Sequence, residues 1–321
     1  AARDLSRMSR LRAAVIGVGY LGTFHAQKYA ALEGVELVGV VDADATRAAE
    51  VAAACGCQAF TDYRELIGRV DAVSVVVPTQ YHYQVAKDFL TAGVHVLIEK
   101  PITVTIEQAD ELISLADSGE LVFQVGHLER FNPVLMAVEE VLIEPLFVES
   151  VRIAPFKPRG TDVNVVLDLM IHDIEIIQHL VKSPVAKIDA IGAPVFTGEE
   201  DIANARIAFE NGCVANVTAS RISLKSERKM RIFQRDAYLT LDFQNKKVLV
   251  AKKGEGELLP GIPNVQVKEQ ELGQSDPLLS EISSFVEAIR EGKQPQVSGR
   301  DGRMALETAL KINEALNRIC P

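Results

Sequence analysis

Residues 15–25 read "VIGVGYLGTFH", and this stretch limits the class of fold that the first part of the chain can adopt. It places Gly17, Gly19 and Gly22 in the spacing G-x-G-x-x-G, after an apolar run and before an amphipathic segment. That strand–turn–helix context is the one in which the spacing binds a dinucleotide. The first glycine permits a tight turn, the second lets the backbone approach a pyrophosphate, and the third allows close packing of helix on strand. The alternative is a glycine-rich turn without a ligand.

An acidic residue follows at the distance expected for a residue that binds the ribose of such a ligand. Asp42 ends the next apolar run, 20 residues after Gly22 (42 − 22). A carboxylate there hydrogen-bonds ribose hydroxyls and repels a 2′-phosphate, so the sequence favours NAD over NADP. Arg47 is a counter-indication, because a nearby arginine can receive that phosphate. We expect Tyr20 and Leu21, inside the glycine motif, to contact the same cofactor.

Up to about residue 127, short apolar runs alternate with amphipathic segments. The runs are almost wholly apolar, as parallel strands covered on both faces should be. We therefore predict an α/β domain over residues 8–127, with a doubly wound parallel sheet that binds NAD. Residues 128–321 show a different rhythm, which predicts an α+β domain with a mostly antiparallel sheet and helices near 165–181, 278–291 and 303–319.

Composition argues against several classes of protein. The chain has 321 residues, of which 48% are hydrophobic and 24% charged, as in globular proteins. Its net charge of −10 argues against a nucleic-acid partner. No apolar stretch approaches the ~18 residues of a membrane span, and the first ten residues carry no signal-peptide run. The four cysteines form no C-x-x-C pair, so we predict reduced thiols, no metal site and a cytoplasmic location.

The predicted helix at 165–181 carries its own indication of function. At about 100° per residue, Asp168, His172, Glu175 and His179 fall on one narrow stripe between apolar flanks. Such a stripe suits a largely buried helix that lines a cleft, and the alternative is a helix with its polar side in water. Because histidine titrates near neutrality and a carboxylate one turn away can orient its ring, Asp168 and His172 are a candidate proton-handling pair rather than metal ligands.

Polar residues also follow the apolar strands, where doubly wound sheets bind their ligands. "VVVPTQYH" offers Thr79 and His82, and "LIEKP" offers Glu99 and Lys100; all four are expected in the cofactor site. An ammonium at a strand end could stabilise the alkoxide that develops when a hydroxyl is oxidised. An ordinary surface lysine before a turn would give the same pattern.

Two further stretches could contact a substrate. "GHLERFNP" offers Arg130 and Asn132, which could reach the nicotinamide half of the cofactor or the substrate, or could form a structural hinge between domains. "APFKPRG" places Lys157 and Arg159 in a proline-bounded loop shortly before the helix at 165–181. Because basic side chains recognise phosphate oxygens, these two residues are candidate ligands of a diphosphate.

Five stretches, in this order along the whole chain, resemble the glucose–fructose oxidoreductase/inositol dehydrogenase (Gfo/Idh/MocA) family: "VIGVGYLGTFH", "IEKPIT", "GHLERFNP", "LDLMIHDIEI" and "SGRDGRMALE". The resemblance implies a Rossmann domain, a second domain whose open sheet builds dimers or tetramers, and NAD(P)-dependent chemistry on a sugar or cyclitol carbon. It also implies that Lys100 contacts the reacting hydroxyl, that His172 is the acid/base, and that Asp168 contacts substrate or cofactor. Met170 departs from the family pattern, which often has glycine there.

"GHLERFNP" followed by "DLMIHDIEII" resembles more closely the branch that oxidises the 3-hydroxyl of UDP-N-acetylglucosamine-type sugars. We therefore expect an NAD-dependent dehydrogenase of a UDP-N-acetyl hexosamine, in which the hydride goes to nicotinamide while Lys100 and His172 handle the hydroxyl proton. The alternatives are a dehydrogenase of a free sugar or cyclitol, and a non-catalytic NAD-binding sensor. A sensor needs none of Lys100, Asp168 and His172, so their presence together favours an enzyme.

Overall fold

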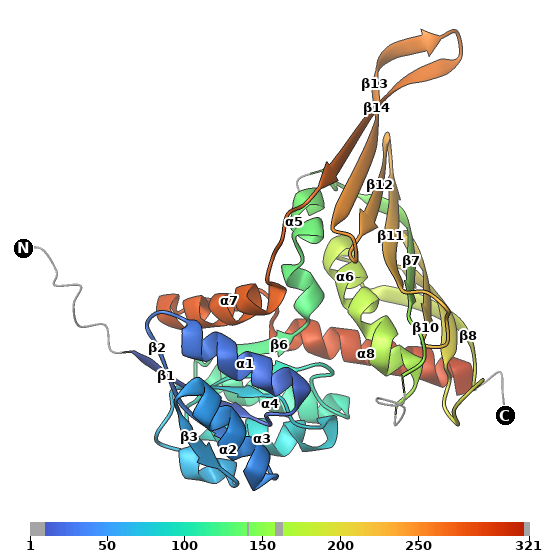
Figure 1. Ribbon diagram of the computed structural model, residues 1–321. Helices are drawn as coiled ribbons and strands as arrows, with labels where there is room; N and C mark the ends of the chain where they lie inside the picture. The colour runs from blue at the N-terminus through green and yellow to red at the C-terminus, as the bar shows by residue number, and fades with distance from the viewer. Residues whose placement is uncertain (1–9, 140, 158–162, 318–321) are drawn as a thin grey trace, which may run out of the picture. The chain divides into compact units, whose positions relative to one another are not determined.

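The computed structural model describes residues 10–139, 141–157 and 163–317 (Figure 1). These residues form two compact units. The first unit contains the described residues up to Leu128 together with Asp276–Arg303, and the second contains Glu129–Ser275 together with the described residues from Met304 onward. In the described part of the chain, no helix has both the length and the apolar character needed to cross a bilayer.

The first unit is built on a six-stranded parallel sheet in the order β3-β2-β1-β4-β5-β6. Its strands are β1 (Leu11–Ile16), β2 (Val35–Val41), β3 (Gln58–Phe60), β4 (Ala72–Val75), β5 (His95–Glu99) and β6 (Phe123–Gly126). Helices follow four of these strands: α1 (Tyr20–Ala31), α2 (Ala45–Cys55), α3 (Thr79–Thr91) and α4 (Ile106–Ser118). The strand order reverses between β1 and β4, the switch point at which doubly wound sheets bind ligands. The predicted parallel sheet is confirmed.

Local chemistry explains where these elements begin. All four residues of β4 are buried, as the apolar run in the sequence requires. The Asp44 side chain accepts hydrogen bonds from the first backbone amides of α2, and Thr105 and Gln108 form a capping box at the start of α4. β3 has three residues and only one of them is buried, so it is too short to show an apolar run.

One helix from the C-terminal part of the chain completes the first unit. In Figure 1, α7 (Pro277–Glu291) lies beside α1. Phe285 of α7 and Tyr29 of α1 are both fully buried in one hydrophobic core with strands β1 and β2. Lys28 of α1 also pairs with Asp276, the N-cap of α7, at 2.5 Å. The change of rhythm after residue 127 predicted a second domain over residues 128–321, whereas the structure groups Asp276–Arg303, including α7, with the first unit.

The second unit is built on an eight-stranded sheet in the order β14-β13-β12-β11-β7-β10-β9-β8. Only the β7–β10 pair is parallel, so the predicted, mostly antiparallel sheet is confirmed. The strands are β7 (Pro145–Ile153), β8 (Val185–Ala193), β9 (Ile202–Phe209), β10 (Val214–Ser220), β11 (Glu227–Gln234), β12 (Ala237–Asp242), β13 (Lys247–Leu259) and β14 (Ile262–Glu271). The helices are α5 (Pro133–Glu139), α6 (Ile171–Val181) and α8 (Gly299–Asn317), of which α8 begins in the first unit.

The sheet of the second unit buries one face under helices. Along β9, Ala203, Ala205 and Ile207 are buried while the residues between them are exposed, the alternation of a strand with one covered face. The buried side chains join α6 and the apolar side of α8 in one core. This packing holds α6, with its polar residues, against the inner face of the sheet (Figure 1).

Candidate cofactor site and active-site residues

At two of the three glycines of the turn, a side chain would collide with the protein's own backbone, and at the third it would not. Gly17 has φ +89°, and a Cβ there would lie 2.5 Å from the carbonyl oxygen of Val76. A Cβ on Gly22 would lie 1.8 Å from the carbonyl oxygen of Gly17. A Cβ on Gly19 would meet no protein atom within 4 Å. Gly19 is also the N-cap of α1 and makes no side-chain cap, so the backbone amides of the first turn remain for an anion such as a pyrophosphate.

A cavity of about 670 Å³ in the first unit borders this turn. It is formed by the ends of β1, β2 and β4 and by the start of α3, as expected for the switch point of the sheet. Its lining residues include Gly17, Gly19, Asp42, Arg47, Tyr63, Arg64, Pro78 and Tyr81. The cavity therefore combines the glycine turn with the predicted ribose-binding carboxylate.

Backbone amides hold the Asp42 carboxylate in the cavity wall. Its Oδ2 accepts a hydrogen bond from the Val18 amide at 3.0 Å, and its Oδ1 accepts one from the Asp44 amide at 2.9 Å. A carboxylate has about four acceptor positions, so two remain for ribose hydroxyls. Arg47 and Arg64 line the same cavity, but a 2′-phosphate would also have to lie beside the Asp42 charge. The residues present fit NAD.

Three other residues that were predicted to contact the cofactor lie in or next to elements that border the cavity. Tyr20 is 71% exposed at the start of α1, and its ring packs edge-to-face on Phe24 with centroids 5.2 Å apart. Leu21 is half-buried in the same helical turn. Thr79 begins α3 directly after Pro78, which lines the cavity. Direct contact of these three side chains with the cofactor stays a prediction.

His82 holds the loop that follows Lys100. Its ring is 1% exposed, with Nδ1 2.9 Å from the Pro101 carbonyl oxygen and Nε2 2.9 Å from the Val77 carbonyl oxygen. Burial lowers the pKa of His82, although both carbonyl groups oppose that shift. A neutral ring donates to one carbonyl at a time. Because both ring nitrogens face backbone carbonyls, His82 ties the end of β4 to the loop after Lys100 rather than offering a nitrogen to the cofactor.

The catalytic candidates of the second unit lie where a π-helical turn joins α6. Asp168 is in the π-helical segment Val166–Met170, His172 is in the first turn of α6, and both side chains are half-buried. Widened turns of this kind occur frequently at functional sites. Met170 is fully buried in the hydrophobic core of this unit. The methionine that departs from the family pattern therefore packs into the core.

The prediction that this helix is largely buried is confirmed, and ion pairs account for part of its polar stripe. The Glu175 carboxylate accepts a hydrogen bond from Arg130 at 2.6 Å, and both side chains are at most 5% exposed. His179 Nε2 lies 2.9 Å from Glu139, and burial lowers the pKa of this histidine. Arg130, a predicted substrate contact, is therefore engaged with the helix that carries His172.

A second buried ion pair on α6 was not predicted. Arg152 of β7 donates to Asp173 at 2.8 Å and to Glu129 at 3.2 Å. Burial alone would lower the pKa of Arg152, but the two carboxylates outweigh it and raise the pKa. No local pattern signals this pairing, because it joins a strand to a helix 21 residues later.

The structure describes two of the three remaining residues that were predicted to contact the substrate. Asn132 Oδ1 accepts from the Val134 amide at 3.1 Å, and its Nδ2 donates to Glu129 at 3.1 Å and to the Phe243 carbonyl at 3.3 Å. These bonds support the structural alternative for Asn132. Lys157 is exposed in the loop after β7. Arg159 lies outside the described residues.

Comparison with known proteins agrees with this geometry. Residues 11–127 match the oxidoreductase family with an NAD-binding Rossmann fold, and residues 154–240 match the GFO/IDH/MocA C-terminal domain. The chain belongs to the Gfo/Idh/MocA family of oxidoreductases. It is therefore an NAD-binding oxidoreductase, and the glycine turn with Asp42 is the part of the chain that suits the dinucleotide.

The relatives match nearly the whole chain but differ in sequence identity to it. UDP-N-acetylglucosamine 3-dehydrogenase of Acidithiobacillus ferrooxidans is 42% identical over 310 residues, which cover 96% of this chain and 98% of that protein. A solved structure of that enzyme, with the same coverage of both chains, matches with a TM-score of 0.91. Inositol 2-dehydrogenase of Rhizobium meliloti is 25% identical over 316 residues, covering 93% of this chain and 94% of that protein. A structure of scyllo-inositol dehydrogenase from Lactobacillus casei with bound NAD(H) and scyllo-inositol shares the fold, at 22% identity and a TM-score of 0.81, and covers 96% and 97% of the two chains.

Proposed function

We propose that this protein is an NAD-dependent dehydrogenase that oxidises the 3-hydroxyl of a UDP-N-acetyl hexosamine. The observation that carries the proposal is the 42% identity, over 96% of the chain, to a UDP-N-acetylglucosamine 3-dehydrogenase. The dinucleotide turn and the Asp42 carboxylate support the cofactor half of the proposal.

The catalytic roles rest on three residues. Oxidation of a secondary alcohol releases a hydride and a proton, and NAD, when bound, accepts the hydride. The Lys100 ammonium stabilises the alkoxide that develops as the proton leaves. His172 accepts that proton, because imidazole is the side-chain group whose ordinary pKa lies closest to neutrality. Asp168 orients the ring and stabilises its charged form.

His172→Ala tests the proton step. We expect turnover to be lost while NAD still binds, because His172 lies in the second unit and the dinucleotide turn lies in the first. His179→Ala is the matched control on the same helix: His179 pairs with Glu139, so we expect turnover to survive. Turnover near the wild-type rate in the His172 variant would show that another group is the base.

The nucleotide part of the substrate supplies a second test. We propose that Lys157 and Arg159 bind the diphosphate, since both are basic and stand in the sequence shortly before the helix of His172. Arg159→Ala should raise KM for the nucleotide sugar much more than KM for NAD. Equal effects on the two constants would contradict a diphosphate contact.

The second candidate function is oxidation of a free cyclitol, because inositol 2-dehydrogenase is also a relative over nearly the whole chain. The deciding assay offers NAD with UDP-N-acetylglucosamine, UDP-glucose, free N-acetylglucosamine and inositols, and follows the absorbance of reduced nicotinamide. An added electron acceptor recycles cofactor that stays bound. Turnover confined to the UDP-N-acetyl sugar supports the proposal, turnover of inositol alone replaces it, and NAD binding without turnover of any alcohol favours the sensor.

We also propose that the chain forms a homodimer or homotetramer in the cytoplasm. The alternation along β9 supports assembly, because it leaves one face of the eight-stranded sheet exposed. Cys55 and Cys57 are free thiols, as in a reducing compartment. Light scattering on the purified protein measures the first point, and a monomer at micromolar concentration would contradict it.

A further inference from the structure

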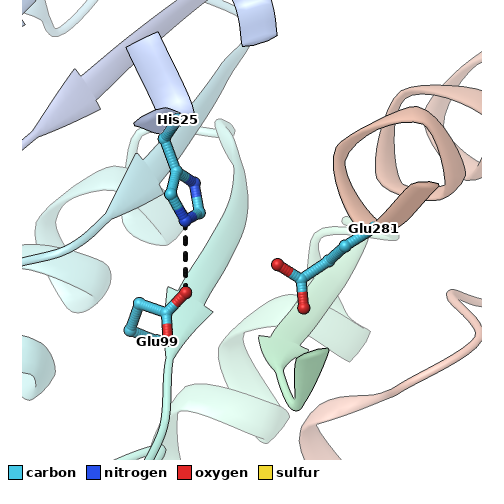
Figure 2. Close-up of side chains that lie close together, drawn as sticks. All are labelled: His25, Glu99 and Glu281. Carbon is cyan, nitrogen blue, oxygen red and sulfur yellow. Dashed lines mark hydrogen bonds and ion pairs between the residues drawn. The ribbon is translucent and has the colours of Figure 1, made fainter. Parts of the chain in front are cut away.

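Three titratable side chains converge inside the first unit. His25 of α1, Glu99 at the end of β5 and Glu281 of α7 each offer one nitrogen or oxygen atom within 4.8 Å of the other two (Figure 2). His25 and Glu281 are fully buried, and the side chain of Glu99 is 13% exposed. Only Glu99 was expected from the sequence to belong to a site, and Lys100 is the next residue.

The hydrogen bonds around His25 can form a chain in which each group donates to the next. Its Nδ1 lies 3.1 Å from Ser74 Oγ, and Ser74 Oγ lies 2.9 Å from the Tyr29 hydroxyl. Burial raises the pKa of Tyr29, so the hydroxyl keeps its proton and can donate it to Ser74. Ser74 then donates to Nδ1, and Nε2–H donates to Glu99 Oε1 at 3.2 Å. A neutral imidazole satisfies the whole chain.

The Glu99 carboxylate accepts two hydrogen bonds, whereas the Glu281 carboxyl group makes none among the described residues. The other Glu99 oxygen accepts from the Lys100 amide at 3.3 Å, so both Glu99 oxygens act as acceptors. Both carboxyl oxygens of Glu281 are buried without a hydrogen-bond partner among the described residues. Leaving an unpaired charge in such a place costs several kcal/mol.

In the described part of the chain, the groups that face Glu281 offer it no compensating charge. From α1 come His25 and Tyr29, both neutral in the chain above, while Lys28 on that helix pairs with Asp276. From β5 comes the negative Glu99. From β6 comes the uncharged Gln124, whose amide donates to the backbone oxygen of Glu281 at 3.1 Å. Burial and the Glu99 charge raise the pKa of Glu281 well above its ordinary value.

We propose that Glu281 is held as a neutral carboxylic acid, so that the Glu99–Glu281 pair carries one negative charge instead of two. Glu281 is thus a positioning residue. It limits the negative charge that would draw the Lys100 ammonium away from a substrate oxygen. This last effect rests on the proposed function, whereas the neutral state of Glu281 does not.

A divalent cation is the competing account of the same cluster. A metal needs an unprotonated Nε2 on His25, which puts the proton on Nδ1 and reverses the chain through Ser74. Ser74 Oγ and the Tyr29 hydroxyl would then have two protons and only one acceptor position between them, so one hydroxyl proton would lack an acceptor among the described residues. The hydrogen bonds therefore favour a neutral Glu281 over a bound cation.

Glu281→Gln tests whether Glu281 is neutral, because the amide has the shape and charge of the neutral acid. As pH rises past about 4.3, the unfolded chain releases the Glu281 proton while the folded chain keeps it, so the wild type loses stability with rising pH. The variant lacks this loss. We expect its Tm to equal or exceed that of the wild type at about pH 8, by about 2–4 °C for each unit by which folding raises the pKa. The difference should shrink toward about pH 4.5.

Glu287→Gln on the exposed side of α7 is the matched control, and it should show no such trend. Infrared spectra of the wild type at neutral pH should contain the carbonyl band of a buried carboxylic acid, and Glu281→Gln should remove it. That measurement holds even if the variant folds poorly. A variant less stable than the wild type at about pH 8, together with stoichiometric bound metal in the purified wild type, would overturn the proposal.

The proposed effect of Glu281 on catalysis is tested by a separate measurement. Ionisation of Glu281 should end activity on the alkaline side, so Glu281→Gln should move the alkaline limb of the kcat profile to higher pH. An unchanged limb would remove the positioning role. If the protein oxidises no sugar at all, the Tm and infrared results still decide where the proton lies.

Discussion

Replacement of Gly19 by alanine should separate cofactor binding from folding. An added methyl group meets no protein atom within 4 Å, and the φ of −66° at Gly19 is open to any residue. The loss of a favourable N-cap costs about 0.5–1 kcal/mol. The stiffer unfolded chain returns about 0.4–1 kcal/mol. The two terms nearly cancel, so we expect the Tm without cofactor to change by less than about 4 °C.

The same methyl group lies where a pyrophosphate would approach the turn. A hydrogen bond to a charged group contributes about 1.5–3 kcal/mol, so losing one bond to the phosphate should weaken NAD binding roughly 10- to 150-fold. Calorimetric titration of the purified protein with NAD measures this change. An unchanged Kd for NAD would refute the view that the backbone at Gly19 contacts the pyrophosphate.

Gly22→Ala is the matched comparison within the same turn. Its Cβ would lie 1.8 Å from the Gly17 carbonyl oxygen, so the turn itself has to shift. Overpacking of this kind costs about 1–3 kcal/mol or more, and the Tm without cofactor should fall. If the Gly19 and Gly22 variants lose the same stability, the distinction between a ligand-facing glycine and a packing glycine is wrong.

Three further outcomes are expected from single residues. Asp42→Ala should weaken NAD binding and raise the affinity for NADP relative to NAD, measured as a ratio of Kd values, because the carboxylate that repels a 2′-phosphate is gone. Arg152→Met leaves Asp173 buried without its partner and should lower the free energy of unfolding in urea by about 3–5 kcal/mol, part of which Asp173→Asn should restore in the double variant. Asp201 accepts hydrogen bonds from three backbone amides and from Arg221; burial alone would raise its pKa, but these bonds outweigh burial and lower it. The contribution of Asp201 to stability is therefore present above about pH 4 and is lost as pH falls through the lowered pKa of the folded protein. The Tm of Asp201→Asn should fall furthest below that of the wild type near neutrality, and the difference should narrow in acid. A difference that does not depend on pH would contradict this.

The sheet of the first unit could be predicted because local sequence patterns indicate most of its strands. Each apolar run is short, bounded by polar residues and followed by a helix, and the glycine spacing names the turn after β1. The membership of α7 could not be predicted in this way. Its amphipathic pattern indicates that Phe285 is buried but not that it shares a core with Tyr29, since that core joins segments 256 residues apart (285 − 29).

The same difference between local and long-range information applies to the candidate site. Helical spacing predicted a buried helix over residues 165–181 with Asp168 and His172 on one side, because an α-helix sets which positions lie one turn apart. The spacing could not show that Glu175 pairs with Arg130 or that Asn132 caps α5, since both partners come from the fold. Met170 shows the limit of resemblance, because a family pattern does not say which side chain enters the core of a particular member.

The place of α7 has a consequence for how the protein is made. A ribosome that has released residues up to Leu128 has delivered all six strands of the first unit but not the helix that covers β1 and β2. The apolar surface of this unit therefore stays uncovered until Asp276–Arg303 emerge, which begin 148 residues after Leu128 (276 − 128). A gene fragment that encodes only the dinucleotide motif and its sheet would leave the same surface in water, so a cofactor-binding fragment of this protein has to carry the distant helix as well.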